Sequence, residues 1–481
     1  MTIVRQARSS MWGETSCSTS ASSSRSARPI RSRASLLWSW LGSVMIVRRA
    51  GMPAPLTTAW GLRRVTAAPM ADPIEAVVVG AGPSGCATAL HLADRGHAVV
   101  VLERGDRPVR GGKVCGEGLM PHGVAALGRL GLEPRALGCA FRGIAYRSGE
   151  HCAVGDFPQG KVGIGLRRSR LDPALRRAVE RHPGVRFHTG IRVTGLRERP
   201  GGLALETSQG PLEARVVVGA DGLHSTIRRL AGLAMEPRGP LRYGARQHLH
   251  LAPGRRAPER VEVHALEGIE LYVTPVGPDE INLALLCDRR VTRSFRGDPE
   301  GSFRGLVARS AAGRALLDGA QPLSEVGVCG PLRQRVRGCV ADRLVLVGDA
   351  AGFVDAVTGE GMSLGLMSAE LAAQTVSVGL RTDRLERASL LAYARRRAHL
   401  VRSLCWFTEV VVWGLRRPWL AQAAIAALAR RRPAFEAVLA VQTGHAPSPA
   451  LALVVPGIGA ELLRAGIGAL IGPRAHRALS E

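Results

Sequence analysis

The sequence predicts an α/β fold in which a parallel sheet carries an inserted, mainly antiparallel β domain and is followed by a helical C-terminus. Three patterns predict it. Apolar runs of strand length alternate with helix-spaced segments between residues 71 and 235, short strand patterns dominate from 240 to 335, and the chain from 360 onward has helical character. With 481 residues, the chain is long enough for two or three domains and a substantial core.

The first predicted unit is a strand, a glycine turn, a helix and a second strand within residues 76–103. An apolar run at 76–79 ends in the turn GAGPSG, a helix-like segment follows as far as Gly96, and a second apolar run at 98–102 ends on Glu103. This order is the layout of a Rossmann-like dinucleotide-binding unit.

Each glycine of this turn has a physical reason. Gly80 permits the tight turn, Gly82 lets a pyrophosphate approach the backbone, and Gly85 lets the helix pack closely on the strand. The free N–H groups and the positive dipole end of the helix then face the phosphates. Glu103 lies 18 residues after Gly85, where a carboxylate can accept hydrogen bonds from ribose hydroxyls.

The remaining elements follow from the same patterns. A helix is predicted at 171–179, where Leu171, Leu175 and Val179 share one face. Buried strands are predicted at 185–188, 191–196, 203–207, 214–219 and 343–347. The runs at 270–274 and 280–286 flank the turn PVGPD and predict a hairpin.

The strand at 214–219 is followed by a carboxylate and a glycine. It delivers Asp221 and Gly222 to the sheet edge where doubly wound folds bind ligands. Two interpretations stay open: a ligand contact or an ordinary strand-end turn. His224 beside this turn is either catalytic or, as the pattern favours, a surface loop histidine.

The strand at 343–347 leads into a second carboxylate. It runs into the sequence GDAAG, so that Asp349 is placed to hold ribityl hydroxyls. The turn TGEGM then opens a helix at Gly361 and Met362. The N–H groups and positive dipole end of that helix suit a reduced flavin, which is negatively charged near its N1/O2 edge.

A glycine-rich loop at 110–121, RGGKVCGEGLMP, presents a lysine and a cysteine. The chain otherwise uses arginine for its positive charge and has only two lysines, Lys113 and Lys161. The presence of Lys113 therefore indicates that an ammonium group is needed in this loop.

Composition excludes several classes of function. The formal charge of +26 comes almost entirely from arginine in a chain rich in Ala and Gly, which is typical of a GC-rich genome. Aromatic residues do not interleave with the arginines, so we expect no nucleic-acid partner. The nine cysteines are scattered without CxxC or metal-ligand spacing, which indicates reduced thiols in a cytoplasmic protein and no metal site.

The two ends of the chain differ from its middle. Residues 1–70 are rich in Ser and Arg with one acid, Glu14, and are interpreted as a disordered tail, a transit-like peptide or the product of a start assigned too early, since Met70 precedes the first strand. No run of 18 apolar residues lacks charges, so no transmembrane helix is predicted. The C-terminal segments are interpreted as packed amphipathic helices, with peripheral contact with a membrane as the alternative.

Together, the motifs GAGPSG, GADGLHSTIRR and LVLVGDAAGFVDAVTGEGM resemble the FAD-dependent oxidoreductases of the p-hydroxybenzoate hydroxylase fold, which have a GR2-type FAD-binding domain. The resemblance spans residues 74–373, and the loop GGKVCGEGL is most similar to the geranylgeranyl reductase branch. It implies an FAD-binding domain over 71–240 and 336–380, a substrate-binding β-sheet domain over 241–335, and a C-terminal helical region over 381–481.

The resemblance also implies roles for individual residues. Gly80, Gly82, Gly85 and Glu103 would bind the ADP half of FAD; Asp221 and Gly222 would serve FAD and an incoming NADH or NADPH; Asp349 would hold the ribityl chain; Gly361 and Met362 would lie at the flavin ring; Arg104, Lys113, Arg168 and Gly352 would contact the cofactor; and Cys115 would lie near the isoalloxazine as the candidate catalytic residue.

The sequence departs from the reductase branch at one motif. The aromatic YxWxFP motif of geranylgeranyl reductases is replaced here by Tyr272-Val273-Thr274-Pro275, which lacks the tryptophan. We therefore expect an NAD(P)H-dependent monooxygenase that hydroxylates an aromatic or polyketide-like small molecule. The alternatives are a flavoenzyme that reduces C=C bonds of a prenyl or polyketide substrate, and a flavin-binding protein without turnover. The strands at 240–335 mix apolar residues with polar ones such as Gln247 and His248, which suits a mostly apolar substrate.

Overall fold

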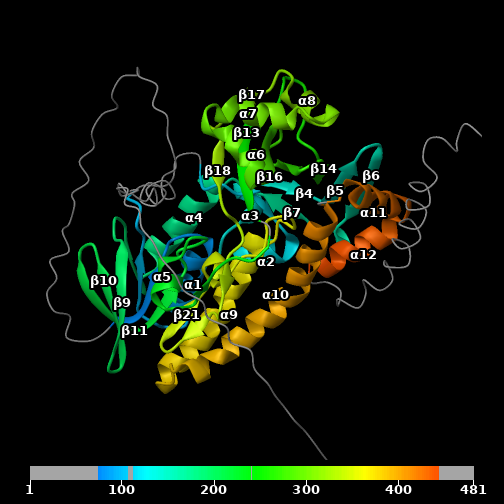
Figure 1. The fold of residues 1–481 in the computed structure, drawn as a ribbon. Helices are drawn as coiled ribbons and strands as arrows, with labels where there is room; N and C mark the ends of the chain where they lie inside the picture. The colour runs from blue at the N-terminus through cyan, green and yellow to red at the C-terminus, as the bar shows by residue number, and fades with distance from the viewer. Residues whose placement is uncertain (1–73, 107–111, 240, 416, 444–481) are drawn as a thin grey trace, which may run out of the picture. The chain divides into compact units, whose positions relative to one another are not determined.

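The computed structural model describes residues 74–106, 112–239, 241–415 and 417–443, without the side chains of 403–407 and 410. The interpretation of residues 1–70, the start of the glycine-rich loop at 107–111 and the C-terminal residues 444–481 lie outside the described residues. All described residues belong to one structural unit, which Figure 1 shows as a ribbon.

The first sheet is formed by the predicted strand and glycine-turn segments. In spatial order its strands are β20 (Val340–Ala341), β21 (Leu344–Leu346), β11 (Gly210–Gly219), β1 (Ile74–Val79), β2 (Val99–Leu102) and β8 (Val185–His188). All neighbours from β21 to β8 run parallel, so their carboxyl ends share one edge. The antiparallel strands β10 (Gly202–Thr207) and β9 (Val193–Arg199) continue from the first half of β11.

Helices pack on this sheet through small residues. They are α1 (Pro83–Ala93), α4 (Arg168–Arg181), α5 (Thr226–Leu230) and α9 (Gly361–Thr382). The shorter helices α2 (Pro121–Gly128) and α3 (Pro134–Leu137) contact each other, and α2 packs on α9 and β7 (Gly163–Gly165). Helix α1 contacts both α4 and α9. A Cβ atom added at Gly365 would lie 2.6 Å from Ser84 Oγ, and one at Gly348 would collide with the same hydroxyl. The N-terminal turns of α1 and α9 can therefore approach each other closely.

The second sheet is mainly antiparallel. In spatial order its strands are β17 (Gln321–Pro322), β13 (Arg242–His250), β16 (Glu280–Asp288), β15 (Ile269–Pro275), β14 (Val261–Leu266), β5 (Gly143–Ser148) and β6 (His151–Asp156), and β18 (Gly327–Cys329) also pairs with β13. The predicted hairpin is confirmed as β15 and β16.

Two strands of this sheet come from outside the segment 241–335. Residues 143–156 lie within the segment 71–240 that the resemblance assigns to the FAD-binding domain, yet β5 pairs in parallel with β14, from Ile144 opposite Val261 onward, and β6 pairs with β5. Propensity and local pattern do not predict this arrangement because the partner strand is distant in sequence. The domain limits at 70, 240, 335 and 380 stay predictions.

Both faces of the second sheet are covered. Along β15, Ile269, Leu271 and Val273 face the helices α6 (Arg289–Thr292), α7 (Pro299–Val307) and α8 (Ala311–Leu317), whereas Tyr272 faces the opposite side. On that side lie α10 (Arg387–Leu415), α11 (Pro418–Arg430) and α12 (Arg432–Gln442). The alternation follows the two-residue period of a strand.

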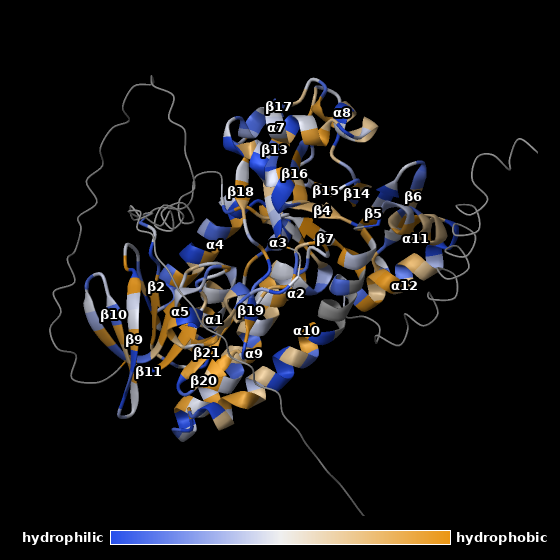
Figure 2. Ribbon diagram, in the orientation of Figure 1, coloured by the Kyte–Doolittle hydropathy of each residue, from blue (hydrophilic) through white to orange (hydrophobic). Residues whose placement is uncertain are grey.

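We call the core between these helices and the sheet the helix-covered cluster. It contains Met120, Phe141, Ile144, Ala153, Phe157, Val261, Val263, Tyr272, Ala284, Leu286, Leu332, Val357, Val412, Ile425, Phe435, Val438 and Leu439. Figure 2 shows both apolar and polar turns along α10, as expected for a helix with one buried face.

Short elements complete the fold: the sheet of β3 (Gly118–Leu119), β7 (Gly163–Gly165) and β4 (Cys139–Phe141), the pair β12 (Ala234–Met235) and β19 (Arg335–Val336), and single 3₁₀ turns including η3 (Gly348–Ala351). The predicted fold class is confirmed: a Rossmann-like domain, a mainly antiparallel sheet and C-terminal helices. Within the described part of the chain, no helix is both long and apolar enough to cross a membrane.

Candidate flavin site

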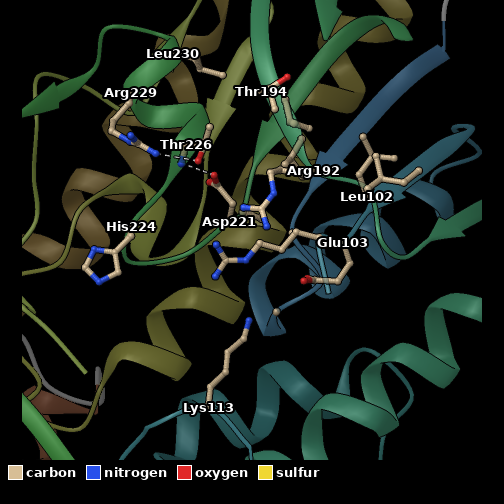
Figure 3. Close-up of a pocket in the computed structure, with 17 residues that line it drawn as sticks. Leu102, Glu103, Lys113, Arg192, Thr194, Asp221, His224, Thr226, Arg229 and Leu230 are labelled. Carbon is tan, nitrogen blue, oxygen red and sulfur yellow. Dashed lines mark hydrogen bonds between the residues drawn. The ribbon is translucent and has the colours of Figure 1, made fainter. Parts of the chain in front are cut away.

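A cavity of about 480 Å³ lies at the carboxyl ends of β1, β2 and β11 (Figure 3). It is lined by Val79, Gly80, Gly82, Leu102, Glu103, Arg104, Lys113, Ile191, Arg192, Val193, Thr194, Ala220, Asp221, His224, Thr226, Arg229 and Leu230. The structure thus brings together six predicted cofactor residues: Gly80, Gly82, Glu103, Arg104, Lys113 and Asp221.

The glycine turn has the close packing that the sequence suggests. Gly80 has a φ of +104°, and a Cβ atom there would lie 2.6 Å from the carbonyl oxygen of Ala220. A Cβ atom at Gly85 would collide with the carbonyl oxygen of Gly80. Helix α1 begins after Gly82 without a side-chain cap, so its first N–H groups stay available to an anion.

Glu103 is held at the end of β2 by backbone N–H groups. Its Oε2 accepts a hydrogen bond from Ala81 N at 2.9 Å, and its Oε1 accepts one from Gly105 N at 3.1 Å. Burial raises the pKa of Glu103, but these hydrogen bonds and the charge of Lys113 outweigh burial and lower the pKa overall. An ionised carboxylate therefore faces the cavity, as binding of ribose hydroxyls requires.

Four cations line the same cavity without a carboxylate partner among the described residues. They are Arg104, Lys113, Arg192 and Arg229. Figure 3 shows Lys113 and Arg192 extending towards the space beside Glu103 from different elements. A positive cavity with one ribose-binding carboxylate and an uncapped helix N-terminus fits the ADP half of FAD.

Asp221 has a structural role that the sequence analysis did not foresee. Its Oδ1 accepts from Ser225 Oγ at 2.5 Å, and its Oδ2 accepts from the N–H groups of Thr226 and Ile227 at 2.6 and 3.1 Å. The carboxylate therefore satisfies the N-terminus of α5, and Gly222 permits the preceding turn with a φ of +82°. Direct contact of Asp221 with a nucleotide stays a prediction.

Exposed His224 also lines the cavity. Partial desolvation of the ring and the nearby arginines, Arg228, Arg104 and Arg229, lower its pKa. The ring is therefore neutral at physiological pH and would present a hydrogen-bonding group to a nucleotide, with no positive charge. The predicted surface loop position is consistent with this exposure.

The second strand end, at β21, places Asp349 in the turn η3, between Gly348 at a φ of +55° and Gly352 at +99°. Burial raises the pKa of Asp349, although Arg168 and Lys113 act in the opposite direction. The long helix α9 starts at Gly361 and Met362, after Glu360, without a side-chain cap. These features fit a ribityl chain and a flavin edge, as the resemblance implies.

The loop with Cys115 is fastened to the second sheet. Asn282 Nδ2 donates to the carbonyl oxygen of Cys115 at 2.9 Å, and an Arg246 guanidinium N–H donates to that of Gly112 at 2.9 Å. Burial raises the pKa of the Cys115 thiol, partly offset by Arg168. Cys115 is therefore a neutral thiol, without the thiolate character of a nucleophile.

Glu117 connects this loop to both domains. Its Oε1 accepts from Arg168 N at 2.7 Å, and its Oε2 lies 2.6 Å from His248 Nε2, with both side chains fully buried. Burial lowers the pKa of His248 despite its carboxylate partner, and Arg246 acts in the same direction. A neutral His248 therefore donates from Nε2 to Glu117 while its Nδ1 accepts, with Arg246 3.1 Å away.

Arg168 does not offer a free guanidinium. Its Nε and terminal nitrogen donate to Asp172 at 2.7 and 2.9 Å on the same helix, α4. Its charge acts on the Cys115 thiol, so it lies near the predicted flavin ring, but its role as a flavin contact stays a prediction.

Sequence reasoning did not assign several residues of the site. They are Glu117, Arg192, Thr194, Arg229, Arg246 and Asn282. The sequence signal for Glu117 was a lone acid between Gly116 and Gly118, and the structure gives this residue a left-handed φ of +60°, which is uncommon for a non-glycine residue. His248 was interpreted as a polar handle for substrate, but its ring is instead bonded to Glu117.

Residues 73–408 match the family model of the FAD binding domain. The chain belongs to this family. Its members bind the cofactor that the cavity fits, and this protein is an FAD-dependent oxidoreductase.

Two curated relatives are reductases. The flavoenzyme is 28% identical over 337 residues to the menaquinone reductase of Mycolicibacterium smegmatis, which covers 64% of this chain and 78% of the relative. It is 30% identical over 338 residues to digeranylgeranylglycerophospholipid reductase 2 of Methanopyrus kandleri, which covers 67% of this chain and 81% of the relative.

Solved structures share the fold of the flavoenzyme. A flavoprotein/dehydrogenase from Cytophaga hutchinsonii superposes with a TM-score of 0.70 at 18% identity, covering 82% of this chain and 99% of that one. The probable FAD-dependent monooxygenase pqsL from Pseudomonas aeruginosa superposes with a TM-score of 0.63 at 21% identity, covering 73% and 99%. At these identities the likeness establishes the fold alone.

Proposed function

We propose that the protein is an FAD-dependent reductase that saturates a C=C bond in an apolar, prenyl-type substrate, with NADH or NADPH as the electron donor. The observation that carries the proposal is the loop at 112–118, which is similar to that of geranylgeranyl reductases and is fixed to the second sheet by Asn282, Arg246 and His248. The names of both curated relatives denote reductases of lipid-like compounds. We therefore propose reduction as the first candidate, although the sequence alone favoured hydroxylation.

The chemistry balances simply. The substrate C=C, NAD(P)H and one proton give the saturated product and NAD(P)⁺, with bound FAD supplying the hydride-transfer chemistry. The chain's own residues bind the cofactor and orient it. Gly82, Glu103 and Lys113 would hold the ADP half, Asp349 the ribityl chain and the start of α9 the flavin edge.

The helix-covered cluster supports an apolar substrate. It extends from Met120, immediately after β3, to Tyr272, whose hydroxyl donates to the carbonyl oxygen of Val357 at 2.9 Å in the segment before α9. Phe141 and Phe157 add an aromatic pair with centroids 5.8 Å apart. An apolar core beside the start of α9 would surround a hydrocarbon chain bound there with apolar side chains and few polar groups.

The second candidate is an NAD(P)H-dependent monooxygenase, favoured by the absence of tryptophan from the segment Tyr272 to Pro275. In that reaction one oxygen atom of O₂ enters the substrate and the other leaves as water. We further propose a cytoplasmic location, supported by the seven free cysteines of the described residues.

Single-turnover reaction of reduced enzyme under strict anaerobiosis separates the two candidates. The reductase forms saturated product without oxygen and reoxidises its flavin stoichiometrically. A panel of prenyl, polyketide and aromatic compounds, each tested for stimulation of NAD(P)H oxidation, identifies the substrate class. Product that appears only after oxygen is admitted would refute the reductase and support the monooxygenase.

A further inference from the structure

Two tryptophans are exposed at the turn between α10 and α11. Trp413 lies near the end of α10 and Trp419 in the first turn of α11, with 55% and 57% of their surfaces exposed. They are the largest of the exposed apolar side chains in the described part of the chain. Two exposed indoles six positions apart indicate a contact surface more strongly than single exposed aliphatic residues do.

The same turn is positively charged. The Arg417 guanidinium lies 4.1 Å from the centroid of the Trp413 ring and donates to the Trp413 carbonyl oxygen at 2.9 Å. From 387 to 442 the sequence has ten arginines and two glutamates. Both glutamates are already paired, Glu409 with Arg333 and Glu436 with Arg432. The segment of these three helices is therefore positive as a whole, and Arg417 places a positive charge at the turn itself, beside the two indoles.

Buried neighbours of the two tryptophans fix this turn to the protein. Val412, beside Trp413, is 3% exposed and belongs to the helix-covered cluster, and Leu420, beside Trp419, is 7% exposed. The helices thus keep their apolar faces on the second sheet while the two indoles project outward. The exposure of the two indole rings therefore does not result from loose packing of the core beneath them.

We propose that the α10–α11 turn docks on the surface of an anionic lipid bilayer. Indole rings favour the headgroup level of a membrane, and arginine side chains pair with lipid phosphates. A second copy of the chain would bring the Arg417 charges together and is the less favourable occupant. The docking would place the enzyme where a lipid-soluble substrate is dissolved, but it does not depend on the identity of that substrate.

Vesicle flotation of the full-length, FAD-loaded protein tests the proposal. We expect binding to phosphatidylcholine vesicles that contain phosphatidylglycerol and much weaker binding to pure phosphatidylcholine. Trp413→Gln/Trp419→Gln should lower partitioning more than tenfold, because each indole loses apolar contact with the interface. Arg417→Gln should lower it about fivefold. Val378→Gln, at an equally exposed apolar residue on α9, is the matched control and should leave partitioning unchanged.

FAD absorbance and circular dichroism verify that the variants remain folded. Equal flotation of wild type and the double tryptophan variant would overturn the proposal. So would a wild-type dimer in gel filtration that the tryptophan variant dissociates, since the turn would then be a self-association surface. No substrate is present, so failure of the reductase assay leaves this test intact, and the converse also holds.

Discussion

Glu117→Gln tests whether the buried contact between the Cys115 loop and the second sheet is essential to the fold. Both carboxylate oxygens of Glu117 are in use, one by Arg168 N and the other by His248 Nε2. Glutamine keeps the volume but replaces one acceptor with a donor. Either orientation of the amide therefore sets two N–H donors face to face.

The structure fixes the size of the effect. If His248 moves its proton to Nδ1 to relieve the clash, that nitrogen can no longer accept from Arg246. One hydrogen bond to a charged group, worth about 1.5–3 kcal/mol, is lost, while the Ser324 hydroxyl, 3.1 Å from both His248 Nδ1 and the Arg246 guanidinium, can still bond to each. We expect a destabilisation of about 1.5–3 kcal/mol, the cost of that one hydrogen bond.

Urea denaturation of the apoprotein and the FAD-loaded protein measures this effect. The matched control is Glu262→Gln, because Glu262 lies 3.0 Å from His264 Nε2 but is more exposed, at 22% of its side chain. We expect the control to cost less than about 1 kcal/mol. The Cys115 thiol should also react faster with a thiol reagent in Glu117→Gln. If both variants were equally mild, the reasoning about the buried pair would be refuted.

Three further predictions concern the flavin site. Gly85→Ala forces a methyl group onto the Gly80 carbonyl oxygen, so the free energy of unfolding should fall by at least about 1–3 kcal/mol. The variant should also lose most of its bound FAD, which absorbance measures. The control is Gly128→Ala, whose added methyl group meets no atom within 4 Å and which should retain FAD. Asp349→Asn should stabilise the apoprotein near neutral pH, because a carboxyl with a raised pKa opposes folding once it is ionised. This gain in stability should vanish below the ordinary pKa of 3.8, where the carboxyl is protonated in both the folded and the unfolded state. FAD binding should weaken about tenfold, because a hydrogen-bonding carboxylate is lost. A loss of apoprotein stability in that variant would contradict the burial argument. Glu103 has a lowered pKa, so its contribution to stability is present above pH 4.5 and is lost as the pH falls further. The free energies of unfolding of Glu103→Gln and wild type, plotted against pH, should therefore converge in acid. A constant difference at all pH values would exclude the role of the Glu103 hydrogen bonds.

Local patterns predicted the elements whose determinants are adjacent in sequence. The glycine turn, the strand at 185–188 and the β15–β16 hairpin depend on neighbouring residues, and so they could be derived directly. The Glu117–His248 contact joins residues 131 positions apart, and Arg192, which lines the cavity, donates its backbone N–H to the Ser208 hydroxyl at 3.1 Å, 16 positions along the chain. No periodicity encodes such contacts, because they depend on the tertiary arrangement.

The role of Asp221 illustrates a second limit. The sequence placed a carboxylate at the correct sheet edge, but could not show that Ser225, Thr226 and Ile227 would occupy its oxygens. Capping and ligand binding use the same residue type at the same place, so the pattern alone does not distinguish them.

The parallel pairing of β5 with β14 has a consequence for synthesis on the ribosome. Ile144 cannot pair until Val261 has been synthesised, about 120 residues later. At roughly 5–20 residues per second, synthesis of this segment takes on the order of 6 to 25 seconds. During this interval the β5–β6 hairpin exposes a strand edge and one apolar face to the cytosol or to a chaperone. The emerging chain is thus most vulnerable to aggregation in the middle of translation, before the second sheet can close.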